Sequence, residues 1–250
     1  MLSPPLPPIY VLSVKTFTDR ISHIQKEMAK HDLKFEFIFE YDIDQISPTD
    51  DYQHFSQNSK LSKAAKSITL KHIAAWRKCL EKNHPQILVF EDDVVLDADF
   101  PKKVIEILQK IRGIPQKYLI FLGGADTKVP KNFFSNDDYF FKLNMPTAEA
   151  YITDLDAVKA RLEWLNINKI SLPADHATVK IDQDCSIAHY WPKKSLVTQG
   201  SVFGLFRTTL DKSRARKSPI INNLIFKWKK FKRRTFPQAY YNFIKIFKQP

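Results

Sequence analysis

The amino-acid sequence predicts an α/β fold whose open, mostly parallel sheet is flanked by helices. Two observations predict it: short apolar runs of strand length recur along the chain, and amphipathic segments of helical length stand between them. Strands and helices that alternate at these intervals are typical of parallel sheets joined by crossover helices. Residues 1–211 are expected to form this domain, and residues 212–250 a basic amphipathic tail.

The individual elements follow from local patterns. Buried strands of parallel sheets read as continuous apolar, β-branched runs, and Ile9–Leu12 and Ile87–Phe90 are of this kind. Ser67 is expected to cap a helix that Pro85 ends. The expected order is strand 9–12, amphipathic helix 19–31, strand 34–41, polar loop 42–66, helix 67–83, strand 87–90, helix 100–111, strand 118–121, strand 148–153 and helix 155–165.

The cysteine content and the absence of targeting patterns indicate in which cellular compartment the protein is expected. The two cysteines, Cys79 and Cys185, lie far apart and form no CxxC or Cys/His spacing, so neither structural zinc nor a disulfide framework is expected. The N-terminus lacks the basic and then apolar layout of a signal peptide. No apolar run reaches the roughly 18 residues of a membrane-spanning helix. A cytoplasmic protein is therefore expected.

The net charge of +12 is concentrated in the tail. Twelve of the 39 Lys and Arg lie in residues 212–250, which hold no acid, so residues 1–211 carry 27 basic and 27 acidic residues. A partner that selects positive charge is therefore expected to bind the tail and not the domain.

The carboxylates Glu91, Asp92 and Asp93 follow directly on a predicted buried strand. Ligands bind open α/β sheets at the carboxyl ends of the strands, where the Gly123-Gly124 turn is also expected. Clustered acids need a counter-charge, and a hard cation such as Mg²⁺ or Mn²⁺, completed by phosphate oxygens and water, supplies it. Because side chains alternate along an extended segment, Glu91 and Asp93 are expected on one face and Asp92 on the other.

Other interpretations of the acidic cluster stay open at this point. An exposed acidic turn that caps the next helix has the same pattern, and phosphatases and nucleases also place acids at strand ends. The sequence contains neither GxxxxGK[ST] nor GxGxxG, which disfavours a P-loop nucleotidase and a dinucleotide enzyme.

A longer motif resembles glycosyltransferase family 25, which includes bacterial lipooligosaccharide galactosyltransferases and collagen galactosyltransferases. His72 to Arg77, a short gap, Ile87 to Phe90 and then Glu91-Asp92-Asp93 are similar to the family's order of an SH-x-x-x-W helix, an apolar strand and E-D-D. Further similar segments are 9–12 with Asp19-Arg20, 118–123, 150–152, 172–175 and 190–199.

The sequence departs from the family pattern on the donor side. The family's GEIGC turn is Ala64 to Ile68 here, its Ser before the His is Lys71, and its Asn-Leu-Asp is Ser13-Val14-Lys15. These departures put the donor-loop contacts, and so the identity of the sugar, in doubt.

The resemblance implies a GT-A-like (Rossmann-type) fold and inverting transfer of a hexose from UDP-galactose or UDP-glucose to a glycolipid oligosaccharide. Inversion needs a base for the acceptor hydroxyl. Asp175 matches the family's late aspartate and is the expected catalytic residue, although it could equally cap a short helix; Glu149 and Asp182 are alternatives. The expected metal ligands are Asp93 and Glu91, and the expected substrate-binding residues are Val11, Leu12, Arg20, His72, Phe90, Glu91, Asp92, Gly123 and Gly124.

His72 and Trp76 lie four residues apart and so share one face of their helix. Such residues are more often core than ligand contacts, and for His72 both interpretations stay open. Arg20 and Arg77 could each meet a phosphate or simply face solvent.

The tail interleaves aromatic residues and cations. Leu224, Trp228 and Phe231 at helical spacing give an apolar stripe flanked by Lys and Arg, a pattern typical of peptides at an anionic membrane surface. Nucleic acid also fits such a composition, as does a solubilising tail; the membrane is favoured and nucleic acid is not expected.

Three functional hypotheses remain. The first is a metal-dependent glycosyltransferase, using Mn²⁺ or Mg²⁺, that extends a bacterial surface glycolipid at the cytoplasmic side of the inner membrane. The others are a non-enzymatic protein that binds membrane or nucleic acid through its tail, and a metal-dependent phosphoester hydrolase.

Overall fold

A computed structural model describes most of the predicted domain and little of the predicted tail. The boundary between residues 211 and 212, and most of the tail, lie outside the described residues. Those described are 5–124, 139–201, 205–206, 224–225, 227–228 and 231–232.

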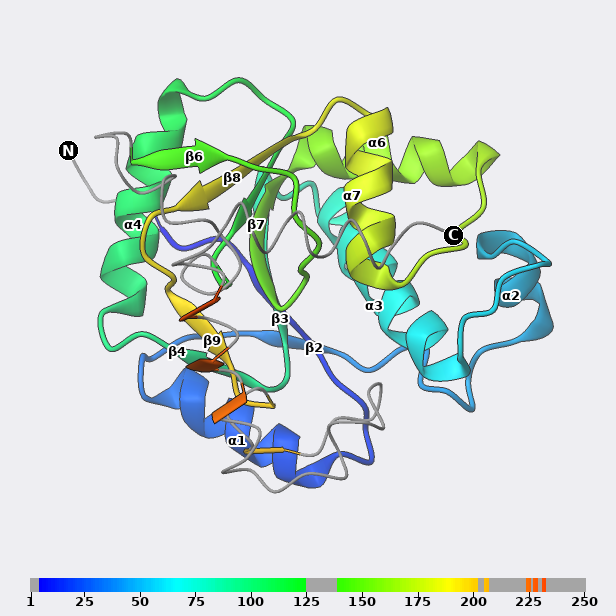
Figure 1. Cartoon of the computed structure of the whole chain (residues 1–250), viewed down its shortest axis with the longest axis horizontal. Coiled ribbons are helices and arrows are strands. Elements are labelled where there is room, and N and C mark those ends of the chain that lie inside the picture. The colour runs from blue at the N-terminus through cyan, green and yellow to red at the C-terminus, as the bar shows by residue number, and fades with distance from the viewer. Residues whose placement is uncertain are drawn as a thin grey trace.

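A seven-stranded mixed sheet forms the centre of the domain, with the order β2-β1-β3-β7-β5-β8-β6 (Figure 1). β7 runs antiparallel to β3 and β5, and β6 antiparallel to β8, while the remaining pairs are parallel. The predicted α/β fold with a mostly parallel sheet is therefore confirmed. The strands are β1 (Ile9–Leu12), β2 (Glu36–Ile38), β3 (Gln86–Glu91), β5 (Tyr118–Phe121), β6 (Phe140–Lys142), β7 (Ala150–Asp154) and β8 (Ala188–Pro192).

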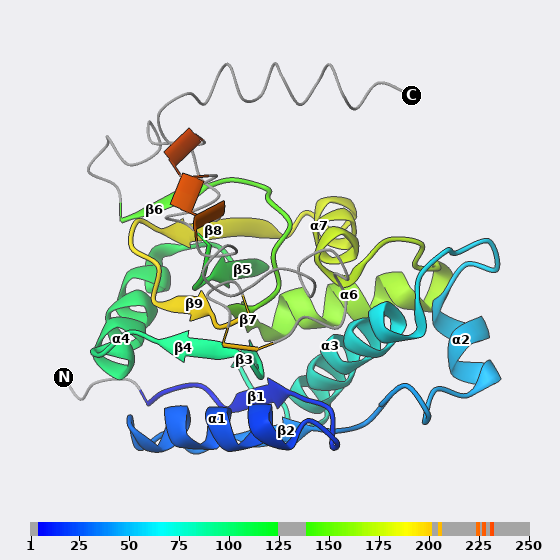
Figure 2. The same ribbon diagram turned by 60° about the horizontal axis from the view of Figure 1, so that its bottom comes forward.

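Helices cover both faces of this sheet (Figures 1 and 2). Alternate residues of β1 belong to separate cores: Ile9 and Val11 pack with α1 and α4, whereas Tyr10 and Leu12 pack with α3, α6 and α7. A strand covered on both faces must be apolar on both, which is why β1 and β3 read as continuous apolar runs. The helices are α1 (Thr18–Ala29), α2 (Pro48–His54), α3 (Lys63–Glu81), α4 (Phe100–Lys110, continued by the 3₁₀ turn Ile111–Gly113), α6 (Leu155–Ile167) and α7 (Ala174–Asp184).

A second, two-stranded sheet follows the acidic cluster. β4 (Val94–Leu96) pairs antiparallel with β9 (Val197–Gln199), and the backbone of Gly123 bridges to Val197. This pairing brings the chain after residue 196 back to the carboxyl end of β3, an arrangement that the sequence pattern did not predict.

The prediction of a polar loop over residues 42–66 is wrong, because this range contains α2 and the start of α3. Ser47 and Asp50 form a capping box around Pro48, and Ser62 caps α3 five residues before the predicted cap. Ser67 lies inside α3, where its hydroxyl donates to the Tyr41 carbonyl at 2.6 Å. The short helix α2 could not be recognised from the sequence because most of its residues are polar. Ser67 bonds to the loop at Tyr41 and does not cap a helix.

A buried ionic network joins α6, α7 and β7. Arg161, which is 0% exposed, donates from Nε and Nη2 to the two oxygens of Asp182 at 2.6 and 2.8 Å, and from Nη1 to Thr153 at 2.8 Å. His189 Nε2 lies 2.7 Å from Asp182 Oδ2. Asp182, an alternative base from the sequence, is thus enclosed in the core and serves the packing of the helices.

Candidate active site

The acidic cluster lies at the carboxyl end of β3, as predicted. Glu91 is the last residue of the strand, and Asp92 and Asp93 form the turn before β4. Because β7 runs antiparallel to β3, the start of β7 meets this end, and the Glu91 backbone N–H donates to the Glu149 carbonyl at 2.9 Å. Glu149 thereby joins the cluster, a role that sequence reasoning did not give it.

Asp92 is held by two donors from the first strand–helix unit. The Ser13 hydroxyl donates to its Oδ2 and Arg20 Nη1 to its Oδ1, both at 2.8 Å. Burial raises the pKa of Asp92, against the opposing charge of Arg20. The guanidinium of Arg20 also lies over the rings of Phe17 and Phe206, at 5.5 and 5.4 Å. In this structure Arg20, predicted to contact the substrate, orients a carboxylate of the cluster.

Glu91 and Asp93 have hydrogen-bond partners different from those of Asp92, in the chain from the end of β9 onward. Gln199 Nε2 donates to Glu91 at 3.2 Å, and the Ser201 N–H donates to Asp93 Oδ2 at 3.3 Å. Asp93 is 1% exposed, and its Oδ1 has no hydrogen-bond partner among the described residues. Burial, followed by the charges of Asp93, Glu149 and Asp92, raises the pKa of Glu91 well above its usual range. Burial and the crowding of carboxylates thus disfavour the charged form of Glu91, and a bound cation would favour it.

Glu91 and Asp93 fit a hard divalent cation. Oδ1 of Asp93 accepts no hydrogen bond from the described residues and could serve as an oxygen ligand, and a cation would relieve the repulsion that acts on Glu91. Among the described residues no three His, Cys, Asp or Glu side chains are grouped to hold a metal by themselves. Magnesium sites commonly use only one or two carboxylates and take their other ligands from phosphate and water.

Two glycines follow β5, and the first of them lies beside Glu149. A Cβ on Gly123 would lie 2.8 Å from Glu149 Oε1, so a larger residue would require this carboxylate to shift. Gly124 has a φ of 77°, in the left-handed region that favours glycine. The turn thus lies close to the Glu149 carboxylate through Gly123, and its expected role in binding substrate stays a prediction.

The other predicted substrate-binding residues of the strands are core residues next to the cluster in sequence or in strand pairing. Val11, Leu12 and Phe90 are buried in β1 and β3, and Leu12 pairs with Glu91. Phe90 packs against Phe100 of α4. Their side chains are part of the core, and their predicted contact with substrate stays a prediction.

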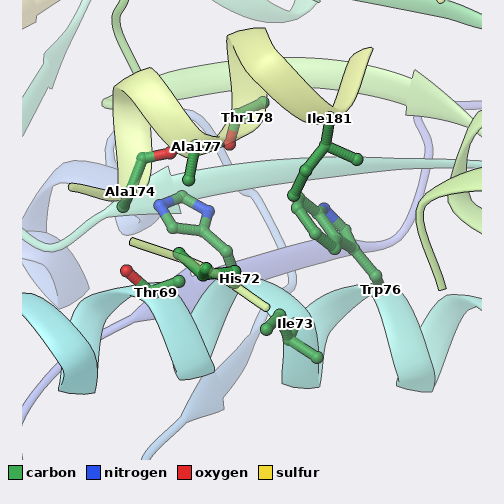
Figure 3. Close-up of a pocket in the computed structure, with 9 residues that line it drawn as sticks. Thr69, His72, Ile73, Trp76, Ala174, Ala177, Thr178 and Ile181 are labelled. Atoms are coloured by element: carbon green, nitrogen blue, oxygen red, sulfur yellow. Dashed lines mark hydrogen bonds between the residues drawn. The ribbon is translucent and has the colours of Figure 1, made fainter. Parts of the chain in front are cut away.

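His72 and Trp76 project from α3 toward α7 and line a small cavity there (Figure 3). The Trp76 Nε1–H donates to the Tyr151 hydroxyl at 3.0 Å, and His72 Nδ1 lies 3.0 Å from the same oxygen. Burial, with Arg161 nearby, lowers the pKa of His72 to about 3, so the ring is neutral at physiological pH. This environment is that of a core histidine, and it places no polar atom of His72 against the acidic cluster.

Asp175 lies at the start of α7, on the side of the His72 cavity. The helix has eleven residues with Pro173 as its N-cap, so the expectation that Asp175 caps a short helix is wrong. Its carboxylate is partly exposed and pairs with His176 Nδ1 at 3.0 Å. Asp175 is therefore accessible. Among the described residues it makes no contact with the acidic cluster.

Lys71, one of the departures from the family pattern, anchors the loop after β2. Its ammonium donates to the Glu40 carbonyl at 2.8 Å and to Asp42 Oδ1 at 2.6 Å, and Asp42 Oδ2 accepts from the Lys15 N–H at 3.0 Å. The buried pair ties the chain segments after β1 and β2 together at the edge where the cluster lies.

Fold and site together define an α/β protein with a carboxylate site at the carboxyl edge of its sheet. The sequence model of glycosyltransferase family 25 (LPS biosynthesis protein) matches residues 6–168, about two thirds of the chain. The chain belongs to this family.

Characterised relatives match over a shorter stretch. The chain is 32% identical over 104 residues to the lipooligosaccharide biosynthesis protein lic2B of Haemophilus influenzae, which covers 39% of this chain and 37% of that protein. It is 27% identical over 105 residues to the lacto-N-neotetraose biosynthesis glycosyltransferase LgtB of Neisseria meningitidis serogroup B, with 39% and 36% covered. The matches thus span less than two fifths of either relative.

Solved structures resemble the chain at low identity. The glycosyltransferase GlyE of Streptococcus pneumoniae TIGR4 aligns with a TM-score of 0.45 at 7% identity, over 91% of this chain and 64% of that one. Mouse xyloside xylosyltransferase 1 aligns with a TM-score of 0.39 at 12% identity, over 74% and 84%.

Proposed function

We propose that this protein is a GT-A-like, metal-dependent, inverting glycosyltransferase that moves galactose or glucose from a UDP-sugar to the growing oligosaccharide of a bacterial lipooligosaccharide or lipopolysaccharide. The observation that carries the proposal is the undercompensated carboxylate site of Glu91 and Asp93, with its unpartnered Asp93 oxygen. Family membership and the two bacterial relatives support it.

In this proposal Glu91 and Asp93 hold Mn²⁺ or Mg²⁺, which supplies Lewis-acid stabilisation of the departing diphosphate. Ser13 and Arg20 orient Asp92 and favour its charged form against the effect of burial. Asp175, whose carboxylate is accessible, acts as the base: one of its Oδ atoms takes the proton of the acceptor hydroxyl.

The donor class can be tested by thermal unfolding of the full chain with a panel of nucleotide sugars, with and without Mn²⁺. A ligand that binds only the folded state raises the midpoint temperature of unfolding. At a ligand concentration of one hundred times Kd, the gain in stability is roughly 2.7 kcal/mol. We expect a shift with a UDP-sugar that depends on Mn²⁺. Absence of any shift would favour the non-enzymatic hypothesis, and turnover of simple phosphoesters without an acceptor would favour the hydrolase.

We also propose that the tail attaches the enzyme peripherally to an anionic membrane, where a glycolipid acceptor resides. The described tail residues Leu224, Trp228 and Phe231 are 62, 57 and 52% exposed, and the rings of Trp228 and Phe231 stack at 5.9 Å. Lys232 lies over the Trp228 ring at 5.0 Å. An apolar stripe beside cations matches the interface of anionic lipids. No helix in the described part of the chain is long and apolar enough to cross a membrane.

Vesicle sedimentation tests this attachment. The full chain is expected to bind phosphatidylglycerol vesicles and not phosphatidylcholine vesicles, less strongly at high salt because the lysines are screened. Trp228→Ala with Phe231→Ala is expected to weaken binding about tenfold or more, since each buried aromatic contributes more than 1 kcal/mol. Ile167→Ala is the matched control, because Ile167 is an apolar residue of the domain that is 85% exposed. Equal binding to both kinds of vesicle would contradict the proposal.

A further inference from the structure

The chain from the last residue of β9 onward lies at the acidic cluster and contacts all three of its consecutive carboxylates, directly or through Arg20. We define the closing segment as Gln199–Ser201 together with Leu205–Phe206. We propose that it is a positioning element of the acidic site, which fixes Glu91, Asp92 and Asp93 for the cation and the donor diphosphate. The role in cation and donor binding rests on the proposed function; the role in holding the carboxylates does not.

Asp93 is held through the backbone of the closing segment. The Gly200 N–H donates to the Asp93 carbonyl at 2.6 Å, and the Ser201 N–H donates to Asp93 Oδ2 at 3.3 Å. A Cβ on Gly200 would lie 2.7 Å from the same carbonyl oxygen, which belongs to the backbone and cannot rotate away. Two successive N–H groups thus hold two oxygens of Asp93, its backbone carbonyl and Oδ2, while Oδ1 accepts no hydrogen bond from the described residues.

Glu91 is held by a side chain of the same segment. Gln199 Nε2 donates to Glu91 Oε2 at 3.2 Å. An amide brings a donor without adding charge, so it orients Glu91 while leaving the negative charge of the cluster available to a cation. Thr198, its neighbour on β9, is exposed and takes no part in this contact.

Asp92 is held indirectly, through an aromatic contact. The Phe206 ring faces the Arg20 guanidinium at 5.4 Å and meets the His23 ring edge-on at 5.0 Å. Arg20 in turn donates to Asp92 at 2.8 Å. The Leu205 N–H donates to the Gly200 carbonyl at 3.0 Å, which folds the segment back over the contacts to Asp93.

Groups that orient metal ligands from behind typically change metal affinity about 10- to 100-fold when they are replaced. The closing segment supplies such groups to every acid of the turn, although it lies more than one hundred residues away in sequence. Gln199 and Gly200 are therefore positioning residues, and neither is proposed to touch the reacting atoms.

Two measurements on the full chain separate the positioning role from the proposed function. Hydrogen exchange of the metal-free protein is expected to be about fivefold faster over residues 90–96 in Gln199→Ala, the effect of one lost hydrogen bond. Gly200→Ala should act in the same direction and more strongly, because its Cβ displaces the backbone. Thr198→Ala should leave this exchange unchanged. Unchanged exchange in both Gln199→Ala and Gly200→Ala would overturn the inference.

Titration with Mn²⁺, followed by the electron paramagnetic resonance of the free ion, is the second measurement. Gln199→Ala is expected to weaken Mn²⁺ binding about 10- to 100-fold, and Thr198→Ala to leave it unchanged. Wild-type affinity in Gln199→Ala, alongside lost binding in Asp93→Ala, would overturn the inference and keep the metal site. If the wild-type chain binds no Mn²⁺, the metal site and the role of the segment toward it both fail, and hydrogen exchange alone decides whether the segment holds the carboxylates.

Discussion

Asp93→Ala is expected to lower the rate of sugar transfer by about a thousandfold. Its side chain offers the one oxygen of the acidic turn that is buried and has no described partner. Lewis-acid stabilisation of a leaving group by a bound cation is worth several kcal/mol, and each 1.36 kcal/mol is a factor of ten in rate. The measurement is release of UDP from a UDP-sugar in the presence of acceptor and Mn²⁺.

The same substitution is expected to leave the metal-free protein at least as stable as the wild type. Removing one charge from a crowded group of acids relieves the repulsion that, together with burial, raises the pKa of Glu91. Asp93→Asn, of nearly equal shape, should behave in the same way, and Asp44→Ala removes an exposed acid as the control. Retained transfer in Asp93→Asn would show that Asp93 binds no metal, whereas loss of folding would show that the acids are structural.

The acidic turn could be found from the sequence because its signal is local. Ile87 to Phe90 can be recognised as a buried strand, and the strand delivers the chain directly into the acids. The topological rule for open sheets then places them at the ligand-binding edge. Strands β1 and β5 were found in the same way, with the bounds that the structure gives them.

The partners of the acids could not be found because they come from distant parts of the chain. Ser13 and Arg20 lie 79 and 72 residues from Asp92, and Gln199 lies 108 residues from Glu91. Only the pairing of β4 with β9 brings the last of these to the site. Three-residue strands such as these have too short a pattern to be recognised.

Functional hypotheses for single aromatic or histidine residues depend equally on packing. His72 was predicted either as core or as ligand contact, since four-residue spacing gives the face of a helix but not what covers it. The cover is α7 with Tyr151, which together enclose the ring. For Arg20, contact with a phosphate and exposure to solvent were both left open, and its guanidinium forms an ion pair with Asp92.

Arg161→Met is expected to lower the free energy of unfolding by about 3–5 kcal/mol. The substitution leaves Asp182 as a buried carboxylate without its bidentate partner, and breaking a buried pair from one side costs this much. Asp182 is otherwise ionised: burial opposes ionisation, but the Arg161 charge and the hydrogen bonds outweigh it, and the pKa of Asp182 is lowered. A carboxyl group whose pKa is lowered on folding contributes stability that is fully present at pH values above its usual pKa of 3.8. This stability is lost as the pH falls from there through the lowered pKa of the folded state.

Urea unfolding at pH 7 and pH 5 measures this effect, which should be equal at the two pH values. Replacing both partners, as Arg161→Met with Asp182→Leu, is expected to recover most of the loss, because a well-packed apolar pair is often as stable as a buried ion pair. The difference between the double variant and the sum of the single ones gives the coupling energy of Arg161 with Asp182. A loss under about 1 kcal/mol in Arg161→Met would mean that water reaches Asp182, and that α6, α7 and β7 are held together by their apolar contacts alone.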